Sequence, residues 1–144
     1  KLNLKKATSS EFDNKGLQII GLINEWTKDG KKIKGTDKDL GGTMRLGSYD
    51  ANLKENSIIK KIYKKKVIKE RHRHRYEVNI NYKEKFEKKG MIFSGLSPDG
   101  TLPEIIELKN HPWFIGVQFH PEFKSRPLAP HPLFSSFIKA SKNH

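Results

Sequence analysis

The sequence has 144 residues, the length of one domain, and contains no apolar run near the roughly 20 residues that a membrane span needs. It has no cysteine, which excludes disulfides, thiolate metal sites and an internal thiol nucleophile. Its 29 Lys and Arg against 16 Asp and Glu give a net charge of +13, which would attract phosphates, although the scattered lysines favour a solvated surface.

The N-terminal part is predicted to hold little regular structure. Residues 1–10 suggest the end of a helix followed by a loop. The apolar run over residues 17–26 begins after Gly16 and ends at a Lys-Asp-Gly turn, which predicts a buried strand. Residues 35–50 are rich in glycine and weakly periodic, so we expect a loop with one short strand over residues 44–49.

The rest of the chain is predicted to alternate short helices and strands. In chain order we expect a helix over 57–63, a strand around 76–78, a helix over 83–89, a hairpin of strands over 91–96 and 102–108, a strand over 113–119 and a helix over 133–140. The helix signals are a cap at Asn56 or Ser57, Gly90 after the second helix and Pro132 before the third. This alternation predicts an α/β layered fold, in which one face of the sheet would lack cover.

His120 and Glu122 follow the most apolar predicted strand. Ligands of open α/β sheets bind outside the carboxyl ends of strands. A histidine there can take a proton from a nucleophile, while Glu122 holds the other ring nitrogen and fixes its tautomer. The structural alternative is a packed histidine beside a surface glutamate, and a His-x-Glu spacing alone does not decide between the two.

The segment RHRHRYEVN, residues 71–79, has an unusual alternation of charge. On a strand, its arginines Arg71, Arg73 and Arg75 would share one face, and His72 and His74 would share the other. Three guanidinium groups on one face would bind a phosphate, a carboxylate or nucleic acid. The structural alternative is a basic edge strand that resists pairing with other chains. No metal site is expected, because neither cysteine nor an acidic cluster completes the two histidines.

Two N-terminal segments also offer binding groups. In GGTMRLG, Gly41 and Gly42 would let backbone N–H groups approach a ligand and Arg45 would add a charge, although a plain connection fits equally well. Thr8 and Glu11 have the spacing of a capping box. No clear amphipathic helix follows them, which leaves Glu11 free for another role.

Taken together, SSEF, LGGTMRLG, ERHRHRYEVN, EIIEL and NHPWFIGVQFHPEFKSRPLAPHPLF stand in the order found in CTP synthases. The chain resembles the C-terminal glutamine amidotransferase domain of that family. The resemblance implies an α/β, class I (triad) glutamine amidotransferase-like layered sheet with flanking helices, here as a partial domain. It implies hydrolysis of glutamine to ammonia, which the parent enzyme uses for ATP-dependent amination of UTP to CTP, with Mg²⁺ and with GTP as activator.

The same resemblance assigns roles to single residues. His120 would be the triad base and Glu122 its orienting partner. Glu11 would bind the α-ammonium of L-glutamine and Arg75 its α-carboxylate. The loop linked to GTP activation would include Thr43 and Arg45. No cofactor is implied within this chain.

The resemblance also implies that the nucleophile lies elsewhere. The family's cysteine stands in a G-x-C-x-G elbow, expected a short distance before Lys1. Residues 1–144 would then be the C-terminal portion of the amidotransferase domain, inactive alone and without the elbow or the synthetase domain. The parent is expected to be a cytoplasmic homotetramer, with neither membrane nor nucleic acid as a partner. Two alternatives remain open: a basic module that binds nucleotides or nucleic acid, and a regulatory pseudoenzyme.

Overall fold

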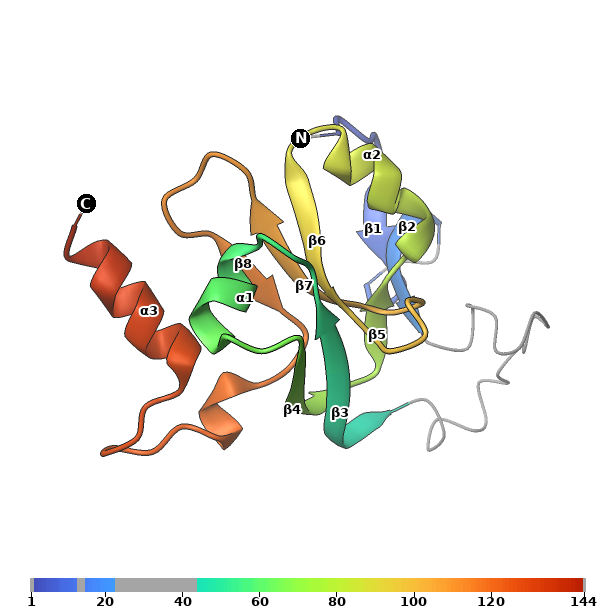
Figure 1. The fold of residues 1–144 in the computed structure, drawn as a ribbon. Helices are drawn as coiled ribbons and strands as arrows, with labels where there is room; N and C mark the ends of the chain where they lie inside the picture. Colours follow the sequence, from blue (N-terminus) through green and yellow to red (C-terminus); the bar gives the residue numbers. More distant parts are fainter. Residues whose placement is uncertain (1, 13–14, 23–43, 144) are drawn as a thin grey trace.

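The computed structural model describes residues 2–12, 15–22 and 44–143. Within these ranges the chain forms a three-stranded sheet and a five-stranded sheet, with short helices at their margins (Figure 1). No helix in the described part of the chain combines the length and apolarity needed to cross a membrane.

The smaller sheet joins segments from the N-terminus and the middle of the chain. Its order is β1 (Ala7–Ser9), β2 (Leu17–Leu22), β5 (Tyr76–Val78), with β1 parallel and β5 antiparallel to β2. The helix end predicted over residues 1–10 is therefore wrong. Gly16 makes this strand pairing feasible, because a Cβ there would lie 2.5 Å from the carbonyl oxygen of Lys6. The part of the predicted strand beyond Leu22 lies outside the described residues.

The larger sheet is antiparallel throughout its described ladders. Its order is β4 (Val67–His74), β3 (Arg45–Leu53), β6 (Met91–Leu96), β7 (Pro103–Leu108), β8 (Ile115–Val117). β3 is longer than the predicted short strand because it pairs with β4 from Arg45 opposite His74 to Asn52 opposite Val67. The predicted strand around residues 76–78 is β5, and the alternating pattern before it forms β4, at an edge of the other sheet.

The three predicted helices are confirmed. α1 (Ile58–Tyr63) begins at Ser57, whose side chain accepts a hydrogen bond from the backbone N–H of Lys60. α2 (Lys83–Glu87) is followed by Gly90 at a positive φ of 84°. α3 (Pro132–Ser141) has proline in its first turn. The predicted hairpin of β6 and β7 is also confirmed.

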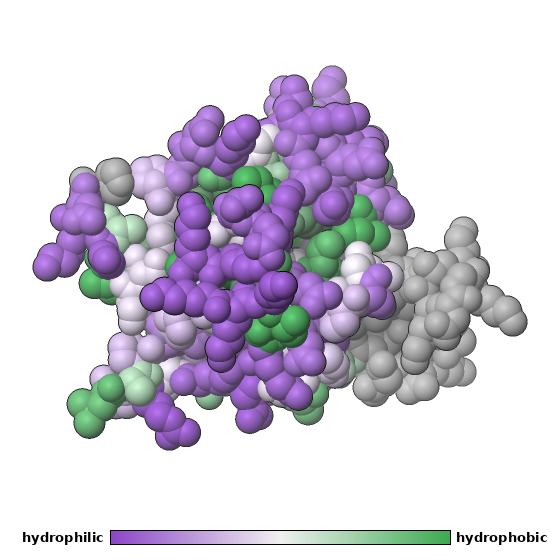
Figure 2. Space-filling model, in the orientation of Figure 1, coloured by the Kyte–Doolittle hydropathy of each residue, from purple (hydrophilic) through white to green (hydrophobic). Residues whose placement is uncertain are grey.

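The core lies between the larger sheet and the helices α1 and α3, which pack against each other (Figure 1). Its buried members are Ala51, Leu53, Ile59, Ile68, Ile105, Phe119 and Leu133. The face drawn in Figure 2 is mostly hydrophilic with small apolar areas, which agrees with the interpretation of the lysines as a solvated surface. Phe119, two residues after β8, packs into this core. The backbone of the next residue, His120, is therefore held in place.

Candidate active site

His120 and Glu122 form a hydrogen-bonded pair just beyond β8. The Nδ1 atom of His120 lies 2.7 Å from Oε1 of Glu122. The short 3₁₀ turn η4 (Pro121–Phe123) begins at His120 and returns the Glu122 carboxylate to the imidazole. The backbone N–H of His120 donates to the carbonyl of Arg71 at 2.8 Å, which anchors the pair to β4. The His120 ring stacks on Phe123 with centroids 4.9 Å apart.

The charges of the pair define the roles of the two ring nitrogens. The hydrogen bond from His120 holds the pKa of Glu122 below its ordinary value, so Glu122 is a carboxylate at neutral pH. A carboxylate only accepts hydrogen bonds, so Nδ1 of His120 carries the proton and Nε2 is the basic nitrogen. The side chains are 37% and 55% exposed, which leaves the pair open to a reacting group. The structure thus brings together the two residues that the sequence predicts as a base and its orienting partner.

A hollow of about 600 Å³ adjoins this pair. Its lining residues are Met44, Leu46, Arg71, His72, Arg73 and Phe123. Arg71 and Phe123 also contact His120, through the backbone and the ring respectively, so the hollow and the pair share a border. Arg71 and Arg73 are on the exposed face of β4, as the alternation predicts, while His72 is buried on the other face.

The two predicted glutamine-binding residues lie at the same end of the smaller sheet. Glu11 follows β1, which runs parallel to β2, and Arg75 precedes β5, which runs antiparallel to β2. The end of β1 and the start of β5 therefore lie at the same end of the sheet, on either side of β2. Arg75 does not continue the arginine face of β4, because the chain bends between His74 and Tyr76. Glu11 is exposed and Arg75 is half-buried.

Arg45 is placed differently from a loop residue. It opens β3, and its guanidinium is buried against the carboxylates of Glu77 and Glu104 at 3.2 and 2.6 Å. The guanidinium also lies 4.5 Å from the centre of the Tyr49 ring. Thr43 lies outside the described residues. The assignment of both residues to a GTP-linked loop stays a prediction.

Sequence reasoning missed a buried polar network around Arg45. It includes His72, His74, Glu77, Glu104 and Gln118. Burial raises the pKa of Glu77 to about 7, although the charge of Arg45 opposes the shift. Burial, aided by the charge of Arg45, lowers the pKa of His72 to about 3 and that of His74 to about 4. The strand period gives only a weak signal for this network, because Glu104 is buried together with both of its neighbours in β7.

A metal is not supported by this network. Across residues 2–12, 15–22 and 44–143, no group of three or more His, Asp or Glu side chains has an arrangement that could hold a metal ion. The rings of His72 and His74 instead contact each other, with Nδ1 of the first 2.8 Å from Nε2 of the second.

Comparisons with known proteins cover nearly the whole chain. The family model described as glutamine amidotransferase class-I matches residues 16–140. The CTP synthase of Pelagibacter ubique is 90% identical over 143 residues, 99% of this chain and 27% of that protein. The CTP synthase of Zymomonas mobilis is 62% identical over 139 residues, 96% of this chain and 26% of that protein. The chain thus spans about a quarter of the length of these curated relatives.

A solved structure gives the same result for the fold. The structure titled Trypanosoma brucei CTPS, glutaminase domain with bound acivicin, superposes with a TM-score of 0.82 at 32% sequence identity. The match covers 99% of this chain and 53% of that chain.

Proposed function

The chain belongs to the class I glutamine amidotransferase family, and from this we propose that it supplies the general base and the substrate-binding residues of a glutaminase. The predicted α/β amidotransferase fold is confirmed, as is the resemblance to the amidotransferase domain of CTP synthases. The observation that carries the proposal is the 2.7 Å contact between Nδ1 of His120 and Oε1 of Glu122, just beyond β8.

This pair has the geometry for nucleophilic catalysis on an amide. Nε2 of His120 takes the proton of a thiol, and the thiolate attacks the side-chain amide carbon of glutamine. Glu122 stabilises the charge of the imidazolium that forms on His120. The imidazolium then protonates the departing ammonia. Water, deprotonated by His120, hydrolyses the thioester and releases glutamate.

The thiol in this scheme comes from outside the 144 residues, which contain no cysteine. The curated relatives are about four times as long as the matched segment, which leaves ample chain to supply it. We assign residues 1–144 to the C-terminal portion of the amidotransferase domain, with the nucleophile elbow and the synthetase domain in the rest of the protein. By itself, the 144-residue chain would lack glutaminase activity.

Glu11 and Arg75 would hold the amino acid end of the substrate. A carboxylate matches the α-ammonium of L-glutamine, and a guanidinium matches its α-carboxylate with two parallel hydrogen bonds. Their position at one end of the smaller sheet supports a shared ligand.

In the full-length protein, the ammonia would aminate UTP to CTP. That step would use ATP and Mg²⁺ bound by the synthetase domain, with GTP acting through the segment that contains Thr43 and Arg45. The proposal extends to a cytoplasmic homotetramer. The support is the high identity to curated CTP synthases.

The test is the substitution His120→Asn in the full-length protein. We expect glutamine-dependent CTP formation to fall by roughly 10²- to 10⁴-fold, the range of general acid–base catalysis. Activity with added ammonia should stay unchanged, because ammonia bypasses the glutaminase step. His111→Asn is the matched control, since His111 is an exposed histidine before β8. Glutamine-dependent activity that survives His120→Asn would refute the proposed role.

A basic binding module is the second candidate, favoured by the exposed Arg71 and Arg73 on an edge strand. Binding of nucleic acid through these residues would weaken log-linearly with salt, with a slope of about 0.9 per phosphate contacted. Loss of that slope in an Arg71→Gln, Arg73→Gln variant would support this candidate. Equal, weak binding by both proteins would count against it.

A further inference from the structure

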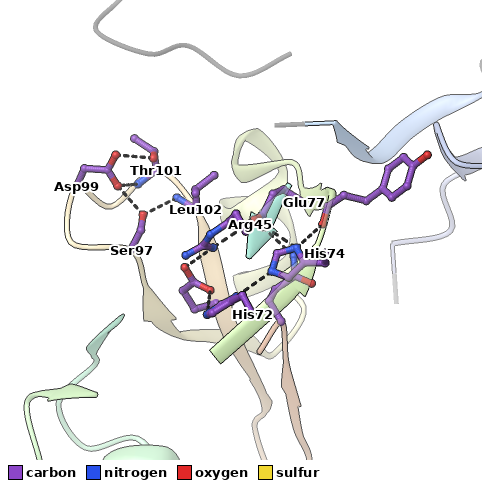
Figure 3. Close-up of polar contacts among 11 residues, drawn as sticks. Arg45, His72, His74, Glu77, Ser97, Asp99, Thr101 and Leu102 are labelled. Atoms are coloured by element: carbon purple, nitrogen blue, oxygen red, sulfur yellow. Dashed lines mark hydrogen bonds and ion pairs between the residues drawn. The ribbon is translucent and has the colours of Figure 1, made fainter. Parts of the chain in front are cut away.

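The buried network joins the two sheets of the domain. Arg45 of β3 and His72 of β4 belong to the larger sheet, whereas Glu77 of β5 belongs to the smaller one. Figure 3 shows Arg45 near the centre of these groups, with Glu77 and His74 to its right and His72 below it. The Arg45 guanidinium contacts Glu77 and also Glu104 of β7, so it holds carboxylates from both sheets.

One hydrogen bond in this network connects the two parts of the candidate active site. The Nε2 amide of Gln118 donates to Oε2 of Glu77 at 2.8 Å. Gln118 stands two residues before His120, and Glu77 stands two residues after Arg75. Two residues of extended chain reach at most about 7 Å, so each partner lies close to the residue it would position.

Both ends of this hydrogen bond are held in place. The backbone N–H of Gln118 donates to the carbonyl of Glu104 at 2.9 Å. The other carboxylate oxygen of Glu77 is 3.2 Å from the guanidinium of Arg45. Glu77 is fully buried, where a carboxylate that lost a partner would be strongly destabilised. The bond therefore has little freedom to lengthen or turn.

We propose that Gln118 and Glu77 are positioning residues, whose hydrogen bond fixes the catalytic His120 relative to the substrate-binding Arg75. The proposal rests on the proposed glutaminase function. Glutamine held by its α-carboxylate must present its side-chain amide to the nucleophile that His120 activates. A shift of about 1 Å between the two ends of such a site can lower the rate 10²-fold.

The test is Gln118→Met in the full-length protein, because methionine keeps the length of the side chain and removes the amide donor. We expect the KM for glutamine to rise and kcat/KM to fall by roughly 10- to 100-fold. Ammonia-dependent CTP formation should not change. The matched control is Ser136→Ala, which removes a hydrogen bond of the same length, 2.8 Å, from Nε1 of Trp113 to α3.

The KM separates positioning from a merely structural role. A variant that only destabilises the fold reduces the active fraction, and so lowers kcat while leaving the KM as it is. Glu77→Gln should keep most of the function, because a flipped Gln118 amide can pair with the new amide. We expect the KM of Glu77→Gln to stay close to that of the wild type.

Two results would overturn the proposal: a KM for Gln118→Met equal to that of Ser136→Ala, or an unchanged KM in Gln118→Asn, whose amide is one methylene too short to reach. Gln118→Asn provides the test if Gln118→Met does not fold. Failure of the glutaminase function is a separate result, because it appears as glutamine-dependent activity that survives His120→Asn.

Discussion

The same side chain takes two different roles in this domain according to its surroundings. His120 is partly exposed and paired with a carboxylate, which suits it to exchange protons. His72 is 2% exposed, and burial lowers its pKa to about 3, so it stays neutral and serves as a hydrogen-bonding group. Sequence letters do not separate these cases, whereas the strand period does: His72 falls on the inward face of β4, and His120 follows a strand end.

Glu122→Gln isolates the charge of the orienting residue. The amide keeps an oxygen that can accept from Nδ1 of His120 but cannot neutralise the imidazolium. We expect glutamine-dependent kcat to fall by about tenfold or more, yet by less than in His120→Asn. Steady-state glutaminase assays of the two full-length variants measure the ratio. A kcat for Glu122→Gln equal to that of the wild type would show that the charge of Glu122 has no part in catalysis.

Arg75→Lys tests the substrate contact. A lysine keeps the charge but loses the paired donors that match a carboxylate, so the KM for glutamine should rise by about tenfold. Arg126→Lys is the control, because Arg126 is exposed and is not among the residues that line the hollow beside His120. Initial rates over a range of glutamine concentrations give both KM values. Equal values for the two variants would assign the α-carboxylate to another group.

At the scale of elements, local signals predicted the helices and non-local pairing decided the strands. Ser57, Gly90 and Pro132 mark helix ends through chemistry within a few residues, so those helices could be predicted. β3 could not be predicted at its full length, because its ladder depends on a partner segment that begins after α1. β1 was mistaken for a helix end because three residues give too short a pattern.

Gly95→Ala tests the packing of the hairpin strands. A Cβ at Gly95 would lie 2.7 Å from Cγ1 and Cδ1 of the buried Ile105, and the β6–β7 register shifts at this glycine. We expect the free energy of unfolding to fall by about 1–3 kcal/mol. Gly116→Ala should lose less stability, because a Cβ at Gly116 would lie 3.0 Å from its nearest neighbour, Cγ1 of Ile106. Urea unfolding of both variants provides the comparison, and equal losses would contradict the packing argument.

At the scale of the whole molecule, the candidate site combines segments that are distant in sequence. Glu11, Arg75 and His120 come from three regions, and the network of Arg45, Glu77 and partners fills the space between the sheets. The spacing of His120 and Glu122 left both a catalytic pair and a packed histidine open, and the family resemblance then favoured catalysis. The burial of Arg45 and of its glutamate partners could not be predicted from the sequence. Charged residues are usually exposed, and the glycine-rich segment around Arg45 suggests a loop.

The network also predicts how stability depends on pH. The folded-state pKa of Glu77, about 7, is above its ordinary value of 4.5, so the native state binds more protons than the unfolded state between these values. Stability contributed by protonated Glu77 is present below pH 4.5 and is lost as the pH rises to about 7. Glu77→Gln should therefore become more stable relative to the wild type as the pH rises through this range.

Urea unfolding at intervals across that pH range measures the difference in the free energy of unfolding between the two proteins. Glu84→Gln, at an exposed position of α2, is the control and should show a difference that varies less with pH. The histidines act in the opposite direction in both proteins, because burial lowers the pKa of His72 and His74 below 6.5. The comparison with the wild type removes that shared contribution. A difference that does not change with pH would contradict the assigned shift of Glu77.

The most direct measurement of the central claim is covalent labelling of the full-length protein with an electrophilic glutamine analogue, followed by mass spectrometry of the intact protein and its peptides. We expect one adduct, on a cysteine outside these 144 residues. We also expect His120→Asn to slow labelling by roughly 10²-fold or more, whereas His111→Asn should leave the rate unchanged. Labelling of the His120→Asn protein at the wild-type rate, or no adduct on any cysteine, would contradict the claim that His120 activates a glutaminase nucleophile.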